Sequence, residues 1–280
     1  MEITHDSLIG TYEQKRALAA QFDLMDDTFF SVVLRDKAAG EYLLTALLGR
    51  PIRIVENHTQ YAIRNIESHS IVLDALIEDD EKKLYNIEIQ VEDKENDARR
   101  MRYYTAAIDW SFLKKSADYK MLPELYMIFI SRYDNLGGGK NHYEIEQHIK
   151  GTDTVYDDGI HKLLFNTAVD DGTELSKLLQ YLKHSDPNNN NFGALSKAVN
   201  YHKINNEGVD SMCKAVEEYA NKIAEQRIIK SRIEGKIEGK IEGKIETVKN
   251  LLKKNISLDL ALECAELDYP TYKKYEDLPQ

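Results

Sequence analysis

The segment "YNIEIQVEDK", residues 85–94, is the most informative part of the sequence for its fold. Its positions alternate between an apolar set and a polar set. The apolar set is Tyr85, Ile87, Ile89 and Val91, and the polar set is Asn86, Glu88, Gln90 and Glu92. Because successive side chains of a strand point to opposite faces, this pattern predicts a strand with one face in a core. The other face places a carboxylate beside an amide, which suits either a solvated edge or a metal-dependent active site.

A second strand is predicted just before it, in the apolar run "SIVLDALIE" at residues 70–78. The polar segment "DDEKK" at 79–83 then predicts a turn, so the two strands form a hairpin. A short turn centred on Glu81 places Asp74 across from Glu88. Since these residues would share one face of the hairpin, we expect their two carboxylates to lie close together.

Asp74 interrupts an otherwise apolar run, and burying a lone carboxylate there would be costly. A divalent cation shared with Glu88 relieves that cost. Mg²⁺ prefers hard oxygen ligands, usually one or two carboxylates together with water and substrate phosphate. We therefore expect Mg²⁺, with Mn²⁺ as a substitute, on Asp74 and Glu88, with the backbone carbonyl of Ile89 as a third ligand. Gln90 would hold the attacking water or a phosphate oxygen. The alternative is a solvated hairpin face.

Around the hairpin, helical and strand-like patterns alternate along the chain. The expected helices lie within 12–48, 97–119 and 174–184 and from 193 onward, and the further strands lie at 52–56, 124–131, 142–149 and 162–168. This order of elements predicts a mixed α/β domain followed by a helical tail.

Three strings of the sequence carry a more specific signal. They are "VLDALIEDDEKKLYNIEIQ", "ARRMRYYTAAIDWSFLKKSADYKMLPELYMIFIS" and "NLGGGKNHYEIE". Together they resemble the PD-(D/E)XK nuclease family transposases, also called recombination-promoting nucleases. The resemblance implies a restriction-endonuclease-like fold, with a mixed central sheet flanked by helices and a helical C-terminal extension. We accordingly expect a nuclease core at 1–185, a helical extension at 186–231, a repeat segment at 232–246 and a small helical tail at 247–280.

The same resemblance implies metal-dependent cleavage of DNA by an endonuclease of a mobile-element family. Asp74 and Glu88 match the metal ligands of the signature, and Gln90 stands in its lysine position. Because Gln90 carries no positive charge, stabilisation of the phosphate would fall more heavily on the metal. Arg100 and Tyr104 lie on the following helix and are expected to contact DNA, although arginines at such positions also form ordinary solvated faces.

Two further expectations concern the site as a whole. Glu41, on the first helical segment, is a candidate for an additional carboxylate, because first-helix acids sometimes join the site in this superfamily. The alternative function is a catalytically inactive nuclease-fold protein that acts as a DNA-binding or oligomeric assembly module.

The overall composition fits a soluble protein of the reducing cytoplasm. The N-terminal "MEITHDSLIGTYEQK" is too polar for a signal peptide, and no apolar run reaches the roughly 20 residues that cross a bilayer. The net charge of −11 argues against nonspecific coating of nucleic acid. Ten basic and five acidic residues lie between positions 222 and 254, so the acidity belongs to the rest of the chain.

The segment "RIEGKIEGKIEGKIE" at 232–246 repeats every four residues. As a helix it would carry a stripe of isoleucines, Ile233, Ile237, Ile241 and Ile245, flanked by Glu on one side and Lys on the other. Its three glycines each cost about 1 kcal/mol relative to alanine, so the isolated helix should be marginal. A parallel pair would place each Glu flank against a Lys flank, which predicts a homo-oligomer. A flexible, unpaired spacer is the alternative.

Overall fold

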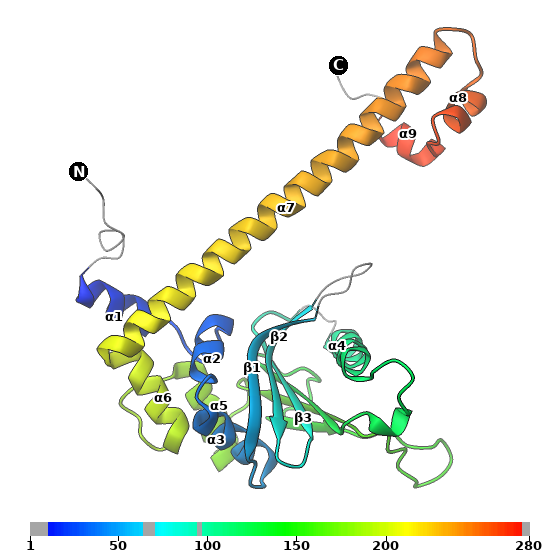
Figure 1. Ribbon diagram of the computed structural model, residues 1–280. Coiled ribbons are helices and arrows are strands. Elements are labelled where there is room, and N and C mark those ends of the chain that lie inside the picture. Colours follow the sequence, from blue (N-terminus) through cyan, green and yellow to red (C-terminus); the bar gives the residue numbers. More distant parts are fainter. Residues whose placement is uncertain (1–10, 64–70, 94–96, 276–280) are drawn as a thin grey trace. The chain divides into compact units, whose positions relative to one another are not determined.

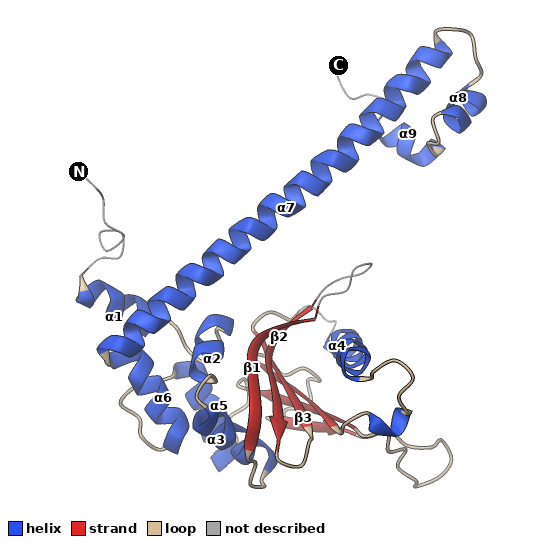
Figure 2. Cartoon of the chain, in the orientation of Figure 1, coloured by secondary structure: helices blue, strands red, loops and turns tan. Residues whose placement is uncertain are grey.

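The computed structural model describes residues 11–63, 71–93 and 97–275, apart from some side chains between 222 and 238. The chain divides into two compact units, Met1–Val216 and Glu217–Gln280. The helices are α1 (Tyr12–Ala20), α2 (Asp27–Val33), α3 (Lys37–Leu48), α4 (Asp97–Phe112), α5 (Glu174–His184), α6 (Gly193–Ile204), α7 (Asn206–Leu252), α8 (Leu258–Cys264) and α9 (Tyr269–Tyr275). The strands are β1 (Ile54–Ile63), β2 (Ile71–Asp79), β3 (Leu84–Gln90), β4 (Leu125–Ser131), β5 (His142–Ile145) and β6 (Ile160–Asn166) (Figures 1 and 2).

The strands of the first unit form one mixed sheet in the order β1-β2-β3-β4-β6-β5. The pairs β1–β2, β2–β3 and β5–β6 are antiparallel, whereas β3–β4 and β4–β6 are parallel. The parallel strands form the centre of the sheet, which explains why "LYMIFIS" in β4 is a nearly continuous apolar run. The mixed sheet that the sequence predicts is therefore confirmed.

Helices cover both faces of this sheet, with α4 on one face and α2 and α3 on the other (Figure 1). Tyr85, Ile87 and Ile89 of β3 pack into the large core formed with α1, α2, α3, α5 and α6. The opposite face packs against α4, where Met101 and Ile108 meet apolar residues of β2, β3, β4 and β6. The polar positions of β3 consequently lie in the layer between the sheet and α4.

Several boundaries differ from the sequence prediction. The helical region at 12–48 is three helices, and the last of them ends at Gly49 in the left-handed conformation (φ 66°). The helix predicted at 97–119 stops at Phe112, and a separate 3₁₀-helix at Tyr119–Met121 begins after the capping side chain of Asp118. The strand predicted at 52–56 extends to Ile63 as β1.

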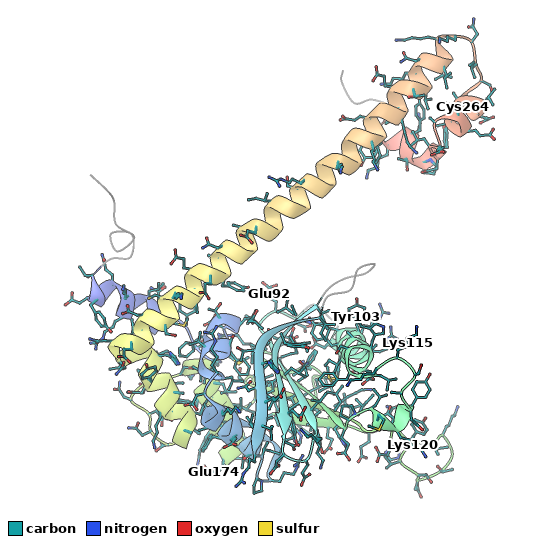
Figure 3. All side chains as sticks on the ribbon, viewed as in Figure 1. Glu92, Tyr103, Lys115, Lys120, Glu174 and Cys264 are labelled. Carbon is teal, nitrogen blue, oxygen red and sulfur yellow. The ribbon has the colours of Figure 1, made fainter. Side chains whose placement is uncertain are left out.

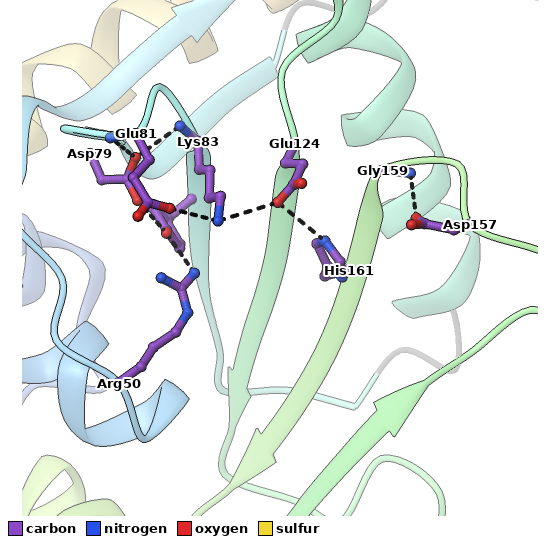
Figure 4. A network of polar contacts seen from close by, with 9 residues as sticks. Arg50, Asp79, Glu81, Lys83, Glu124, Asp157, Gly159 and His161 are labelled. Atoms are coloured by element: carbon purple, nitrogen blue, oxygen red, sulfur yellow. Dashed lines mark hydrogen bonds and ion pairs between the residues drawn. The ribbon is translucent and has the colours of Figure 1, made fainter. Parts of the chain in front are cut away.

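A polar network holds the turn between β2 and β3 (Figure 4). Asp79 Oδ1 accepts hydrogen bonds from the backbone N–H groups of Glu81 and Lys83, both at 2.9 Å. Its other oxygen accepts from the Tyr85 hydroxyl at 2.6 Å, which in turn accepts from Arg50 at 2.9 Å. These bonds fix the turn at Glu81 and therefore set the register of the hairpin at its far end.

The second unit consists of most of α7 together with α8 and α9, which pack around a small core of their own. The buried residues of that core are Ile245, Val248, Ala261, Leu262, Ala265, Leu267 and Tyr272. The repeat segment 232–246 is helical as part of α7. Of its isoleucine stripe, Ile241 and Ile245 pack against this core, whereas the side chains of Ile233 and Ile237 lie outside the described residues.

None of the helices in the described ranges is long and apolar enough to span a membrane.

Candidate functional site

Asp74 and Glu88 meet where the β2–β3 ladder ends. The regular pairs run from Glu78 opposite Leu84 to Ala75 opposite Ile87, and the next two positions are Asp74 and Glu88. Here side chains replace the ladder: Asp74 Oδ2 accepts from the N–H of Ile89 at 2.8 Å, and Glu88 Oε1 accepts from the N–H of Asp74 at 3.3 Å. The structure thus brings together the two carboxylates that the sequence places opposite each other.

The carbonyl of Ile89 also points into this space. In a strand, the N–H and C=O of one residue face the same neighbouring strand. Since the N–H of Ile89 reaches Asp74 on β2, its carbonyl is directed toward β2 as well. The neighbouring carbonyl of Gln90 faces the other way, where it accepts from the N–H of Arg132 at 2.9 Å.

Glu88 is fully buried, and its two oxygens have different surroundings. Oε1 accepts from Asp74 and, with the amide of Asn86 oriented to satisfy its neighbours, from Asn86 at 3.2 Å. Oε2 accepts no hydrogen bond from any described residue, and the guanidinium of Arg100 lies 3.7 Å away. A buried carboxylate oxygen that accepts no hydrogen bond is well suited to bind a cation.

Arg100 and Tyr104 project from α4 onto the same centre. Arg100 donates to Oε1 of Gln90 through Nη1 and to the Tyr104 hydroxyl through Nε at 3.2 Å, and its guanidinium lies 5.3 Å from the centre of the Tyr104 ring. The amide nitrogen of Gln90 is buried and finds no acceptor among the described residues. Arg100 therefore supplies, from the helix, the positive charge that Gln90 lacks.

Burial perturbs both carboxylates. It raises the pKa of Asp74 to about 7, and the charge of Asp27 adds to the effect. Burial and the charge of Asp74 raise the pKa of Glu88 well above its ordinary range. The nearby Arg100 acts in the opposite direction on both groups but does not offset their burial. Two carboxyl groups with raised pKa values beside one guanidinium group are typical of a functional site.

These residues fit a hard divalent cation, because Glu88 Oε2 has no donor among the described residues, Asp74 is bonded to the same stretch of β3, and the Ile89 carbonyl is directed toward β2. Within the described residues, no group of three or more His, Cys, Asp or Glu side chains is arranged to hold a metal. A site on this chain would therefore depend on two carboxylates, a carbonyl, water and substrate oxygens, which is the usual environment of Mg²⁺.

A model of one protein family matches residues 41–232, and its description is PD-(D/E)XK nuclease family transposase. The chain belongs to this family. Its mixed sheet flanked by helices is consistent with the restriction-endonuclease-like fold. No curated protein and no solved structure matches the chain.

One acid close to Asp74 is not predicted from the sequence. Asp27 begins α2, which packs against β1 and β2, and its charge raises the pKa of Asp74. Burial raises the pKa of Asp27 itself, while Arg100 lowers it. Glu41, the acid proposed from the sequence, instead accepts a hydrogen bond from the N–H of Ile54 at 2.9 Å. Acids are common in the first turn of helices, so Asp27 gives no distinctive signal.

The loop after β4 positions both helices of the site. One guanidinium nitrogen of Arg132, Nη2, donates to both carboxylate oxygens of Asp23, at 2.7 and 2.8 Å. Asp23 lies shortly before α2 begins. Tyr133 and Asn135 both donate to Asp97 at the start of α4, at 2.9 and 2.6 Å. One segment of chain thereby ties Asp27 and Arg100 to the end of the central strands.

The raised pKa of Asp74 predicts a pH-dependent cost to stability. The unfolded chain loses this proton near pH 4, whereas the folded chain holds it until about pH 7. Folding is therefore opposed increasingly as the pH rises from 4 to 7, by about 1.4 kcal/mol for each pH unit in that interval. In EDTA, Asp74→Asn should unfold at higher denaturant concentration than the wild type at pH 8, and at a similar concentration at pH 4.

The matched control is Asp153→Asn, which changes an exposed carboxylate and should shift stability little at either pH. The prediction is wrong if Asp74→Asn is equally destabilised at both pH values.

Proposed function

We propose that this member of the family is a divalent-metal-dependent DNA endonuclease that uses Mg²⁺, with Mn²⁺ as a substitute. The observation that carries the proposal is Oε2 of buried Glu88, which lies close to Asp74 and accepts no hydrogen bond from any described residue. Membership of a nuclease family supports hydrolysis of nucleic acid, and the donor set supports a hard cation.

In this proposal the side chains have separate roles. Asp74 and Glu88 hold the ion, which when bound activates water and stabilises charge on the scissile phosphate. The free amide N–H of Gln90 orients the attacking water or a phosphate oxygen. Arg100 presents positive charge to the phosphate from α4, and the Tyr104 hydroxyl and ring hold the guanidinium in place.

Cleavage and ion binding should be lost together. With Mg²⁺ or Mn²⁺, the wild type should nick supercoiled plasmid and bind the ion in isothermal titration. Asp74→Ala and Glu88→Gln should lose both properties, because each removes one of the two anionic ligands. Asp153→Ala, a change at an exposed acid, should retain both.

An inactive assembly or DNA-binding module would behave differently. Arg100 already donates to Gln90 and lies near Glu88. In such a protein its guanidinium would permanently block the space beside the two carboxylates. A wild type that binds no divalent ion and leaves plasmid intact with every metal would favour this function and exclude the endonuclease.

We further propose that the repeat in α7 mediates parallel self-association. The observed continuous helix at 232–246 supports a paired seam rather than an irregular spacer. Since Ile241 and Ile245 pack within the chain, the proposal assigns the seam to the other two isoleucines of the stripe, Ile233 and Ile237. Opposite Glu and Lys flanks would then face each other only when the two helices run in the same direction.

Sedimentation of the full chain tests this seam. The wild type should sediment as a dimer or larger, and Ile233→Asp/Ile237→Asp should sediment as a monomer, because buried carboxylates would oppose pairing. Gly235→Ala, on the opposite side of the helix, should leave the association intact. Equal monomer masses for the wild type and the double variant would rule out self-association.

A further inference from the structure

A groove of about 470 Å³ lies at the C-terminal end of α4, away from the carboxylates. Its lining residues are Asp109, Trp110, Leu113, Lys115, Tyr119 and Leu122. Trp110 is the single tryptophan of the chain, and it is 65% exposed, while Tyr119 is 80% exposed. Large aromatic side chains normally bury most of their surface, so two of them lining one open groove suggest a partner that stacks on rings.

The charge of this segment favours a phosphate-bearing partner. Lys114, Lys115 and Lys120 are exposed along the segment that follows α4, and Figure 3 shows Lys115 and Lys120 beyond the end of the helix. The nearby Asp118 uses its carboxylate locally, since it accepts from the N–H of Lys120 at 2.9 Å. In a chain with a net charge of −11, these lysines offer phosphates a local basic surface.

The one acid in the lining does not oppose such a partner strongly. Asp109 is partly buried, and burial together with the charge of Asp158 raises its pKa. Its carboxyl group can pair with the exocyclic amino or ring N–H groups of a base. Aromatic walls, a lysine and a hydrogen-bonding carboxyl are the components of a nucleobase site.

The groove also lies at a useful spacing from the candidate active site, because both are on α4. Arg100 and Trp110 are ten positions apart, which is about 15 Å along the helix axis. At the spacing of a stacked strand, about 3.4 Å per nucleotide, that distance corresponds to about four nucleotides, and an extended strand spans it with fewer. A strand whose phosphate lies at Arg100 can therefore extend to the groove.

We propose that this groove binds an unpaired base of the DNA strand held at the nuclease site, so the preferred substrate contains a single-stranded segment. The inference rests on the proposed endonuclease function. A base inside a duplex cannot stack on Trp110, whereas an unpaired base presents its whole face.

Fluorescence of the single tryptophan tests the proposal directly. The full-length protein is titrated in EDTA, which prevents cleavage, with a single-stranded oligonucleotide and with a blunt duplex of the same length. The single strand should quench Trp110 emission to saturation. The duplex should change the emission little at the same concentrations.

Variants then assign the effect to the groove. Tyr119→Ala and Trp110→Ala should weaken binding of a labelled single strand by about tenfold or more, measured by anisotropy, because each removes a stacking partner. Trp110→Phe keeps a ring and should retain most of the affinity. Tyr201→Ala, which removes an exposed ring from α6, should bind as the wild type does.

Three outcomes would overturn the proposal: no quenching by the single strand, equal quenching by the duplex, or emission that depends on protein concentration without DNA. The last would identify the aromatic surface as a contact between copies of the chain. Because the titration requires no catalysis, a protein that cleaves plasmid without quenching loses only this inference. A protein that quenches but never cleaves keeps the base-binding groove but loses the proposed endonuclease function, and with it the claim that the base belongs to a strand held for cleavage.

Discussion

The central constraint of this structure is the burial of two carboxylates beside a single arginine. Asp74 and Glu88 lie where the β2–β3 ladder gives way to side-chain bonds, and Arg100 approaches one oxygen of Glu88 at 3.7 Å. Charges removed from water require a partner, and here the raised pKa values of both acids show that compensation is incomplete. A divalent cation would supply the missing positive charge beside the two carboxylates. It would also supply the chemistry of the nuclease family.

The rest of the first unit maintains this arrangement. The Asp79 network fixes the turn, and the turn determines which residue of β2 faces Glu88. The loop after β4 holds α2 and α4 at the same end of the sheet. Gln90 of β3 carries no charge, and the positive charge beside it is that of Arg100 on α4. The packing of α4 against the sheet therefore brings this charge to the carboxylates.

The sequence predicted the hairpin, its register and the pair of acids, because alternation and turn length depend on residues close together in the chain. It also placed Arg100 and Tyr104 correctly on the following helix. It did not predict Asp27, since its approach to Asp74 depends on the packing of α2 against the sheet. It also did not predict β1 beyond Glu56. There polar and apolar residues do not alternate clearly, as expected for an edge strand with partly exposed residues.

Crystals grown with Mn²⁺ would show whether Asp74 and Glu88 share a cation, since anomalous scattering locates the ion independently of activity. We expect one peak within ligand distance, about 2.2 Å, of Asp74 and of Glu88 Oε2. Arg100 should remain at the edge of the site in that structure. An ion bound elsewhere, or none at saturating Mn²⁺ and alkaline pH, would contradict the claim that these two carboxylates share a cation.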